Sequence, residues 1–272
     1  MAGRSASMQV GAVEFAVLGP LAVTRGGDPV PIGGPQVRVV LARLLLDAGH
    51  RVSVAALVDE LWGEHPPADA DRTARTYVSR LRRALRPEPG EGDELLVTLA
   101  GGYELRVEPD AVDATRFERL AAAGRAALDR GEPGVAGPAL GAALAQWRGE
   151  AYAEFATCPA LAAEGTRLDR LRLAAIEDRI AAGLSAGADG APVDNLAALV
   201  QAYPLRERLW GHLMISLYRS GRQAEALAAF RDARAVLVEG HGIEPSPDLV
   251  EIHRKVLTHD PSLARPPVLT AH

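Results

Sequence analysis

Apolar residues near the start of the chain occur in short β-rich runs. Residues 13 to 32 contain these runs, and Gly19-Pro20 and Gly26-Gly27 interrupt them. Because glycine and proline are typical of turns, this segment is predicted to be a small antiparallel sheet.

Three helices are predicted to follow this sheet. From Pro35 the apolar residues recur at helical spacing, and this first helix stops at Gly49. Ser53 is a predicted N-cap for a second helix, which Gly63 closes. A third helix is predicted from about residue 70 to residue 86, where a Pro- and Gly-rich loop ends it.

The segment after the third helix predicts a hairpin, because residues 95–99 and 103–107 flank Gly101-Gly102. From Val112 strand signals vanish, and helical periods continue to about Thr258. The expected fold class is therefore an α+β winged helix-turn-helix domain followed by an all-α tetratricopeptide-like helical domain. The expected boundaries are a disordered N-terminus, the winged helix, the helical domain and a flexible tail, at residues 1–12, 13–109, 110–260 and 261–272.

The third helix carries the chemistry of this sequence. Between residues 72 and 86 it contains six arginines and no acidic residue. At about 100° per residue, one stripe of this helix is apolar and the opposite face is cationic. The apolar stripe consists of Ala74, Val78, Leu81 and Leu85, and the cationic face of Arg72, Thr76, Ser79, Arg80 and Arg83.

An arginine-rich helix is most often an ordinary solvated surface. Here two features favour DNA binding instead: residues 72–86 contain no acid that could pair with their arginines, and a hairpin follows the helix, which is the order of a winged helix. Such a helix lies in the major groove, where arginine can donate two hydrogen bonds to guanine. Arginines at the edges of the helix would contact phosphates.

The second half of the chain contains a helical-repeat pattern. Trp210, Leu213 and Gly221 are followed by Ala226, Phe230 and Ala233, which is close to the tetratricopeptide spacing. An unrelated helical hairpin remains an alternative. Stacked hairpins form concave surfaces that bind partners.

Composition narrows the function. The 272 residues carry a net charge of -5, so any affinity for DNA must be local. The lone Cys158 suits a reducing cytosol, and no segment approaches the roughly 20 apolar residues that would span a bilayer. The single lysine, Lys255, lies outside any P-loop motif, and the seven histidines lack metal-ligand spacing, so no cofactor and no metal are expected.

Residues 71–85 and Gly102-Tyr103 resemble the recognition helix and wing of OmpR/PhoB-type domains. This resemblance implies that Thr76 and Arg80 read bases, and that Arg72, Tyr77, Arg82 and Thr98 hold phosphates. The same interface is expected to include Ser53, Arg75, Ser79, Arg83 and Tyr103. Ala100 stands where many such wings carry an arginine that enters the minor groove.

The whole chain resembles the short form of the Streptomyces antibiotic regulatory protein family, through residues 146–149, 205–209, 217–227 and 242–247. The resemblance implies a cytoplasmic, nucleoid-associated activator of a secondary-metabolite gene cluster. Such a protein would bind direct repeats in double-stranded promoter DNA near the -35 element as a homodimer, contact RNA polymerase holoenzyme and have no membrane partner. The polar Glu64, His65 and Asp69 are expected to face polymerase.

Two other classes of function were weighed. A helical-repeat adaptor could use its winged domain for protein contacts, but it would not need an uncompensated arginine face. An enzyme would need convergent polar groups, and the sequence shows no such group, so no enzyme activity is expected.

Overall fold

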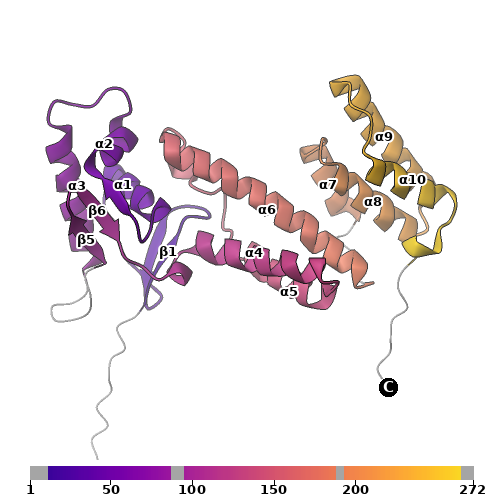
Figure 1. Ribbon diagram of the computed structural model, residues 1–272, viewed down its shortest axis with the longest axis horizontal. Coiled ribbons are helices and arrows are strands. Elements are labelled where there is room, and N and C mark those ends of the chain that lie inside the picture. The colour runs from indigo at the N-terminus through magenta and orange to yellow at the C-terminus, as the bar shows by residue number, and fades with distance from the viewer. Residues whose placement is uncertain (1–11, 87–94, 188–192, 265–272) are drawn as a thin grey trace, which may run out of the picture. The chain divides into compact units, whose positions relative to one another are not determined.

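The computed structural model describes residues 12–86, 95–187 and 193–264 (Figure 1). Contacts within the chain divide it into two compact units. Unit 1 comprises residues 1–120 and 142–172, and unit 2 comprises residues 121–141 and 173–272.

Unit 1 begins with the expected antiparallel sheet. Its strands are β1 (Val13–Ala16), β2 (Ala22–Arg25) and β3 (Asp28–Pro29), in the order β1-β2-β3. Phe15 of β1 lies opposite Val23 of β2, and both side chains are buried. The prediction for this segment is confirmed.

Three helices follow this sheet and pack against one another: α1 (Pro35–Leu46), α2 (Val54–Trp62) and α3 (Ala70–Leu85). The N-cap prediction for Ser53 is confirmed, because its Oγ accepts a hydrogen bond from the Ala56 amide at 3.0 Å. Gly63 follows α2 with a φ of 57°, which suits glycine.

The wing is a three-stranded antiparallel sheet of β4 (Arg51–Ser53), β5 (Leu96–Leu99) and β6 (Gly102–Leu105), in the order β4-β6-β5. The hairpin of β5 and β6 was predicted, but β4 was not, because three residues are too few to show a period. A Cβ on Gly102 would lie 2.2 Å from the Val52 carbonyl oxygen, so this close pairing of β4 and β6 requires glycine.

Residues beyond 109 complete unit 1. The short helix η1 (Pro109–Ala111) leads into α4 (Asp113–Asp129), and η2 (Ala153–Phe155) precedes α6 (Pro159–Ser185). Residues 113–120 of α4 and 159–172 of α6 belong to unit 1, and the rest of both helices belongs to unit 2. The amide of Arg148 donates to the Leu18 carbonyl at 2.7 Å, and Phe15 bridges to Val112. Unit 1 therefore extends past the point where the sequence pattern placed the end of the winged helix.

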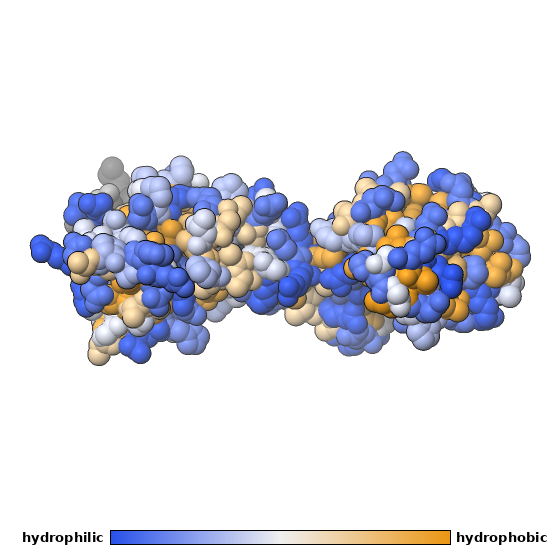
Figure 2. Space-filling view, turned by 90° about the horizontal axis from the view of Figure 1, so that it is seen from above, coloured by the Kyte–Doolittle hydropathy of each residue, from blue (hydrophilic) through white to orange (hydrophobic). Residues whose placement is uncertain are grey.

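Unit 2 is helical and includes α5 (Pro133–Leu144), of which residues 133–141 belong to it, α7 (Val193–Ala202), α8 (Glu207–Arg219), α9 (Gln223–His241) and α10 (Pro247–Leu257). The tetratricopeptide-like pattern lies on α8 and α9, which form a hairpin around Gly221 at a φ of 75°. Most of its residues are buried: Trp210, Leu213, Ala226 and Ala233. Figure 2 shows hydrophobic residues interspersed with hydrophilic ones over α7–α10.

The end of unit 2 differs from the expectation. A flexible tail was predicted from residue 261, but Pro261–Leu263 form the short helix η3, and Leu263 is 5% exposed. Arg219 Nε donates to the Leu263 carbonyl at 3.0 Å. Residues 265–272, the predicted disordered residues 1–11 and the predicted loop within 87–94 lie outside the described residues. No helix in the described ranges is long and apolar enough to cross a membrane.

Candidate nucleic-acid interface

Helix α3 presents one buried face and one exposed face. Ala74, Val78, Leu81 and Leu85 are buried, as their spacing predicted, and α3 packs against α1 and α2. The opposite surface, here called the arginine face, consists of the exposed residues Arg72, Arg75, Thr76, Ser79, Arg80 and Arg83. The packed stripe thus fixes which arginines point to solvent.

Within the described residues, the charges of the arginine face have no acidic partner. In the described part of the chain, no carboxylate lies within ion-pair distance of Arg72, Arg75, Arg80 or Arg83. The Thr76 hydroxyl donates to the Arg72 carbonyl at 3.0 Å, which holds the Thr76 side chain against the helix. A cluster of unpaired cations on a protein with net charge -5 creates a local positive potential that attracts a polyanion.

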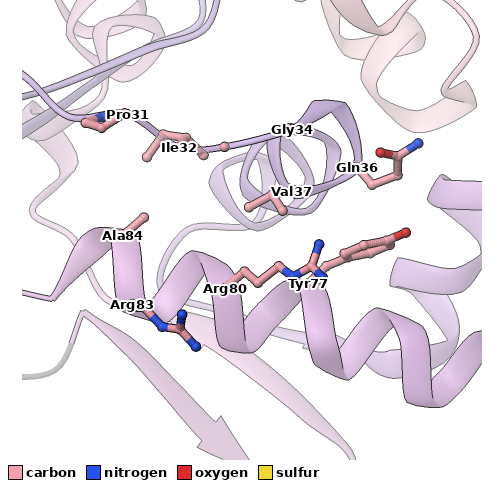
Figure 3. Close-up of a pocket in the computed structure, with 10 residues that line it drawn as sticks. Pro31, Ile32, Gly34, Gln36, Val37, Tyr77, Arg80, Arg83 and Ala84 are labelled. Carbon is pink, nitrogen blue, oxygen red and sulfur yellow. The ribbon is translucent and has the colours of Figure 1, made fainter.

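Aromatic contacts support the middle of this face. The Tyr77 ring lies 6.4 Å from the Trp62 ring, and the Arg80 guanidinium lies 5.9 Å from the Tyr77 ring centroid. Figure 3 shows Tyr77 and Arg80 beside the start of α1, where Gln36 stands. A recess of about 530 Å³ separates α3 from this start of α1. These contacts restrict the rotamers of Arg80 without neutralising its charge.

Arg82 joins the recognition helix to the wing. Its Nη2 donates to Thr98 Oγ1 at 2.7 Å, and its Nε donates to the Leu96 carbonyl at 3.2 Å. At the end of α3, Arg25 Nη2 donates to the Leu85 carbonyl at 2.8 Å. Arginine hydrogen bonds therefore tie α3 to β5 through Arg82 and to β2 through Arg25.

Residues 32–105 match the family described as transcriptional regulatory protein, C terminal, and residues 112–257 match the bacterial transcriptional activator domain. Regulatory protein DnrI of Streptomyces peucetius is 37% identical, and the match covers 93% of this chain and 95% of DnrI. The chain belongs to the Streptomyces antibiotic regulatory protein family. By family, it is a transcriptional regulator.

Other relatives of this regulator are longer. Regulatory protein AfsR of Streptomyces griseus is 42% identical over 94% of this chain, which spans only 26% of AfsR. Among solved structures, Mycobacterium tuberculosis EmbR in complex with a low-affinity phosphopeptide superposes with a TM-score of 0.85 at 33% identity. That match covers 92% of this chain and 66% of the EmbR chain.

Within this regulator, two of the expected contact residues lie in supporting positions. The Ser53 hydroxyl is used as the N-cap of α2, and Tyr103 is 6% exposed within the wing sheet. Thr98, by contrast, is exposed on β5 beside Arg82. Glu64, His65 and Asp69 are exposed in the loop between α2 and α3. The structure thus brings together Thr98 and the residues of α3, whereas Ser53 and Tyr103 shape the elements around them.

The sequence did not reveal a buried carboxylate that supports the winged helix of this regulator. Asp113, at 2% exposure, accepts hydrogen bonds from the amides of Val17 at 2.8 Å and Leu18 at 3.1 Å. Arg148 lies 3.6 Å from the same carboxylate. Burial raises the pKa of Asp113, although the two amides and Arg148 act against that shift. Asp113 therefore fixes the turn between β1 and β2 to the start of α4.

The family motif at residues 146–149 has a structural role that its spacing did not show. Gln146 Oε1 accepts a hydrogen bond from Arg116 Nε at 3.0 Å, and the Trp147 ring packs edge-to-face on Phe117 at 5.2 Å. A Cβ on Gly149 would lie 3.5 Å from the Gly19 Cα, so the two backbones run close together. The motif can be recognised in the sequence, but the residues that it contacts are too distant along the chain to be predicted from residue spacing.

Two glutamates also connect residues of unit 1 that are distant along the chain. Glu154 Oε1 accepts from the Leu21 amide at 2.6 Å and also pairs with Arg38 at 2.8 Å. The buried Glu60 of α2 accepts from the Leu161 amide at 3.3 Å, in the first turn of α6. Carboxylates at such positions satisfy amides that would otherwise lack acceptors. Among the described residues, no group of three His, Cys, Asp or Glu side chains is placed to hold a metal ion.

Proposed function

We propose that this regulator is a sequence-specific activator of a secondary-metabolite gene cluster. It binds direct repeats in double-stranded promoter DNA near the -35 element as a homodimer, and it recruits RNA polymerase holoenzyme. It acts in the cytoplasm, at the nucleoid. The observation that carries this proposal is the arginine face, which has no acidic partner among the described residues and lies on a helix that hydrogen bonds tie to the wing.

We assign the residues of the arginine face and their neighbours either to base edges or to phosphates. Thr76 and Arg80 are both exposed on α3, and we assign them to base edges in the major groove. Arg72, Arg75 and Arg83, with Ser79 and Tyr77, are assigned to phosphates and to the groove edge. Arg82 and Thr98 already bind one another, so we assign them together to the phosphate opposite the wing.

Polymerase contact is assigned to the loop between α2 and α3. Glu64, His65 and Asp69 are exposed there, and no hydrogen bond or ion pair within the described residues engages Glu64 or His65 through its side chain. A loop with free polar side chains beside the recognition helix suits a protein partner that sits next to the operator.

The proposal is tested by footprinting the purified chain across promoters beside its own gene. We expect protection of paired repeats. Arg80→Ala should cost roughly 1 to 3 kcal/mol on the protected site and little on random DNA, because a base contact is lost. Arg179→Ala is the matched control, since Arg179 is an exposed arginine in unit 2.

Two outcomes contradict the proposal. If no promoter is protected at low salt, the arginine face does not bind DNA, and the adaptor alternative takes its place. If Arg80→Ala weakens binding to protected and random DNA equally, the assignment of Arg80 to base readout is wrong.

A further inference from the structure

Unit 2 contains a groove that DNA binding does not use. Helices α7, α8 and α9 enclose a hollow of about 490 Å³. Its floor is apolar and consists of Trp210, Leu213 and Leu217 on α8. These three side chains also belong to the core of the unit, so the floor is held rigidly. Figure 2 shows hydrophobic residues among hydrophilic ones over these helices.

The two walls of the groove share one pattern. Each wall is a single helical face with a carboxylate at its start, alanines one turn later, and a polar residue two turns later. On α7 these residues are Asp194, Ala197, Ala198 and Gln201, and on α9 they are Glu225, Ala228, Ala229 and Asp232. Alanines leave the backbones of both walls accessible to a close neighbour, which is how helices pack against one another.

The rim of the groove is acidic. It carries three carboxylates, Asp194, Glu225 and Asp232, against the single guanidinium of Arg222. Arg222 is engaged by Glu225 at 2.6 Å. Among the described residues, Asp194 and Asp232 have no ion-pair partner, and they stand on opposite walls. An occupant with positive charges at both edges would complement this rim.

We propose that this groove binds an amphipathic helix of a partner protein, with an apolar stripe over two turns and Lys or Arg on both edges. Each wall spans eight residues, 194–201 on α7 and 225–232 on α9, which is about 10 Å along a helix or two turns. Apolar residues at positions i, i+3 or i+4, and i+7 of the partner would meet the floor. An extended peptide fits less well, because helical walls offer no free strand edge to pair with.

This function goes beyond DNA binding and does not depend on it. The carboxylates on the rim repel nucleic acid, so the groove and the arginine face select opposite charges. A regulator with both surfaces can hold promoter DNA and a basic helix of a protein at once.

The test uses the full chain and three fluorescent peptides in anisotropy titrations. The first is a 14-residue helical peptide with leucines at i, i+4 and i+7 and lysines on both edges; the second has glutamates in place of the lysines, and the third is a scrambled version of the first. We expect only the first to bind, and more weakly as salt rises. The double variant Asp194→Lys with Asp232→Lys should weaken its binding by roughly tenfold or more.

The control is Glu239→Lys, which reverses an exposed charge on α9 outside the groove and should leave peptide binding unchanged. Ala198→Trp, at an exposed wall position, should block the groove by size while the promoter footprint stays the same. Circular dichroism verifies that each variant is folded. Equal binding of the acidic peptide, or full binding by the folded double variant, would overturn the proposal, whereas loss of the footprint alone would affect only the DNA-binding function.

Discussion

At the scale of single residues, Arg82 holds the wing against α3, and under the proposed function it also contacts DNA. Its guanidinium donates to Thr98 and to the Leu96 carbonyl, and both acceptors belong to the wing. Arg83, one position later, is exposed and has no ion-pair partner among the described residues. Substitution of Arg82 and substitution of Arg83 should therefore have different effects.

Arg82→Ala should lower the free energy of unfolding by about 1 to 2 kcal/mol, because two hydrogen bonds to the wing are lost. It should also weaken binding to specific and random DNA alike. Arg83→Ala should weaken DNA binding without changing stability. Urea unfolding and gel shifts measure these effects, and equal stability of the two variants would show that Arg82 does not hold the wing.

A second residue-scale prediction concerns His212, whose Nδ1 is buried and has no hydrogen-bond partner among the residues that the structure describes. Burial, followed by the nearby Arg208, lowers the pKa of His212 from 6.5 to about 4. The folded chain thus holds this proton less tightly than the unfolded chain does. Stability should be unaffected above about pH 7 and should fall between about pH 6.5 and pH 4, by up to about 3 kcal/mol.

The comparison with His212→Gln isolates this effect. Buried carboxyl groups such as Asp113 and Glu177, whose pKa values burial raises, act in the opposite direction at acid pH but are common to both proteins. As the pH falls, the wild type should lose the stability that depends on neutral His212, whereas His212→Gln should not. The unfolding free energy of the wild type should therefore fall relative to that of the variant. A difference that stays constant from pH 7 to pH 4 would argue that His212 does not titrate in this range.

At the scale of elements, α4 is joined to the first sheet by one side chain. Asp113→Ala would leave the amides of Val17 and Leu18 without an acceptor in a buried place. We expect a loss of about 2 to 4 kcal/mol in unfolding free energy, since each such amide costs about 1 to 3 kcal/mol. Asp110→Ala, at an exposed carboxylate paired with Arg119, is the control and should change stability little. Chemical unfolding of both variants measures whether Asp113→Ala loses more stability than Asp110→Ala.

The elements also show what the sequence could and could not predict. Apolar spacing and caps were sufficient for α1, α2 and α3, because the buried stripe of an amphipathic helix repeats regularly. Strand β4 was missed because its three residues show no period and because its partner strand β6 lies far along the chain. The arginine face followed from the same spacing, whereas the bond between Arg82 and Thr98 required the fold.

At the scale of the whole molecule, the boundary of unit 1 does not fall where the sequence pattern ends the winged helix. The winged helix ends near residue 109 by pattern, but unit 1 also contains residues 110–120 and 142–172. The contacts of Asp113, Arg148 and Glu154 account for this extension. These are long-range polar contacts, which sequence periodicity does not report.

Removal of the residues that follow the winged helix should therefore destabilise the winged helix. A chain that ends at Asp110 lacks the acceptor for Val17 and Leu18 and uncovers Phe15, which is 0% exposed in the full chain. We expect it to unfold readily and to bind DNA more weakly and less cooperatively. A chain that ends at Gly187 retains all of unit 1 and should keep its fold and its DNA affinity. Circular dichroism and gel shifts compare the two, and full affinity of the shorter chain would show that the added segments are dispensable.

The position of Asp113 and residues 146–154 also bears on how such regulators can be recombined. A chimera that exchanges operator specificity between two family members by a single crossover after the wing would combine the β1–β2 turn of one parent with the carboxylate and the backbone partners of the other. Only exchanges that carry residues 112–172 together with the winged helix, or that replace no more than the exposed side chains of α3, keep each donor with its own acceptor.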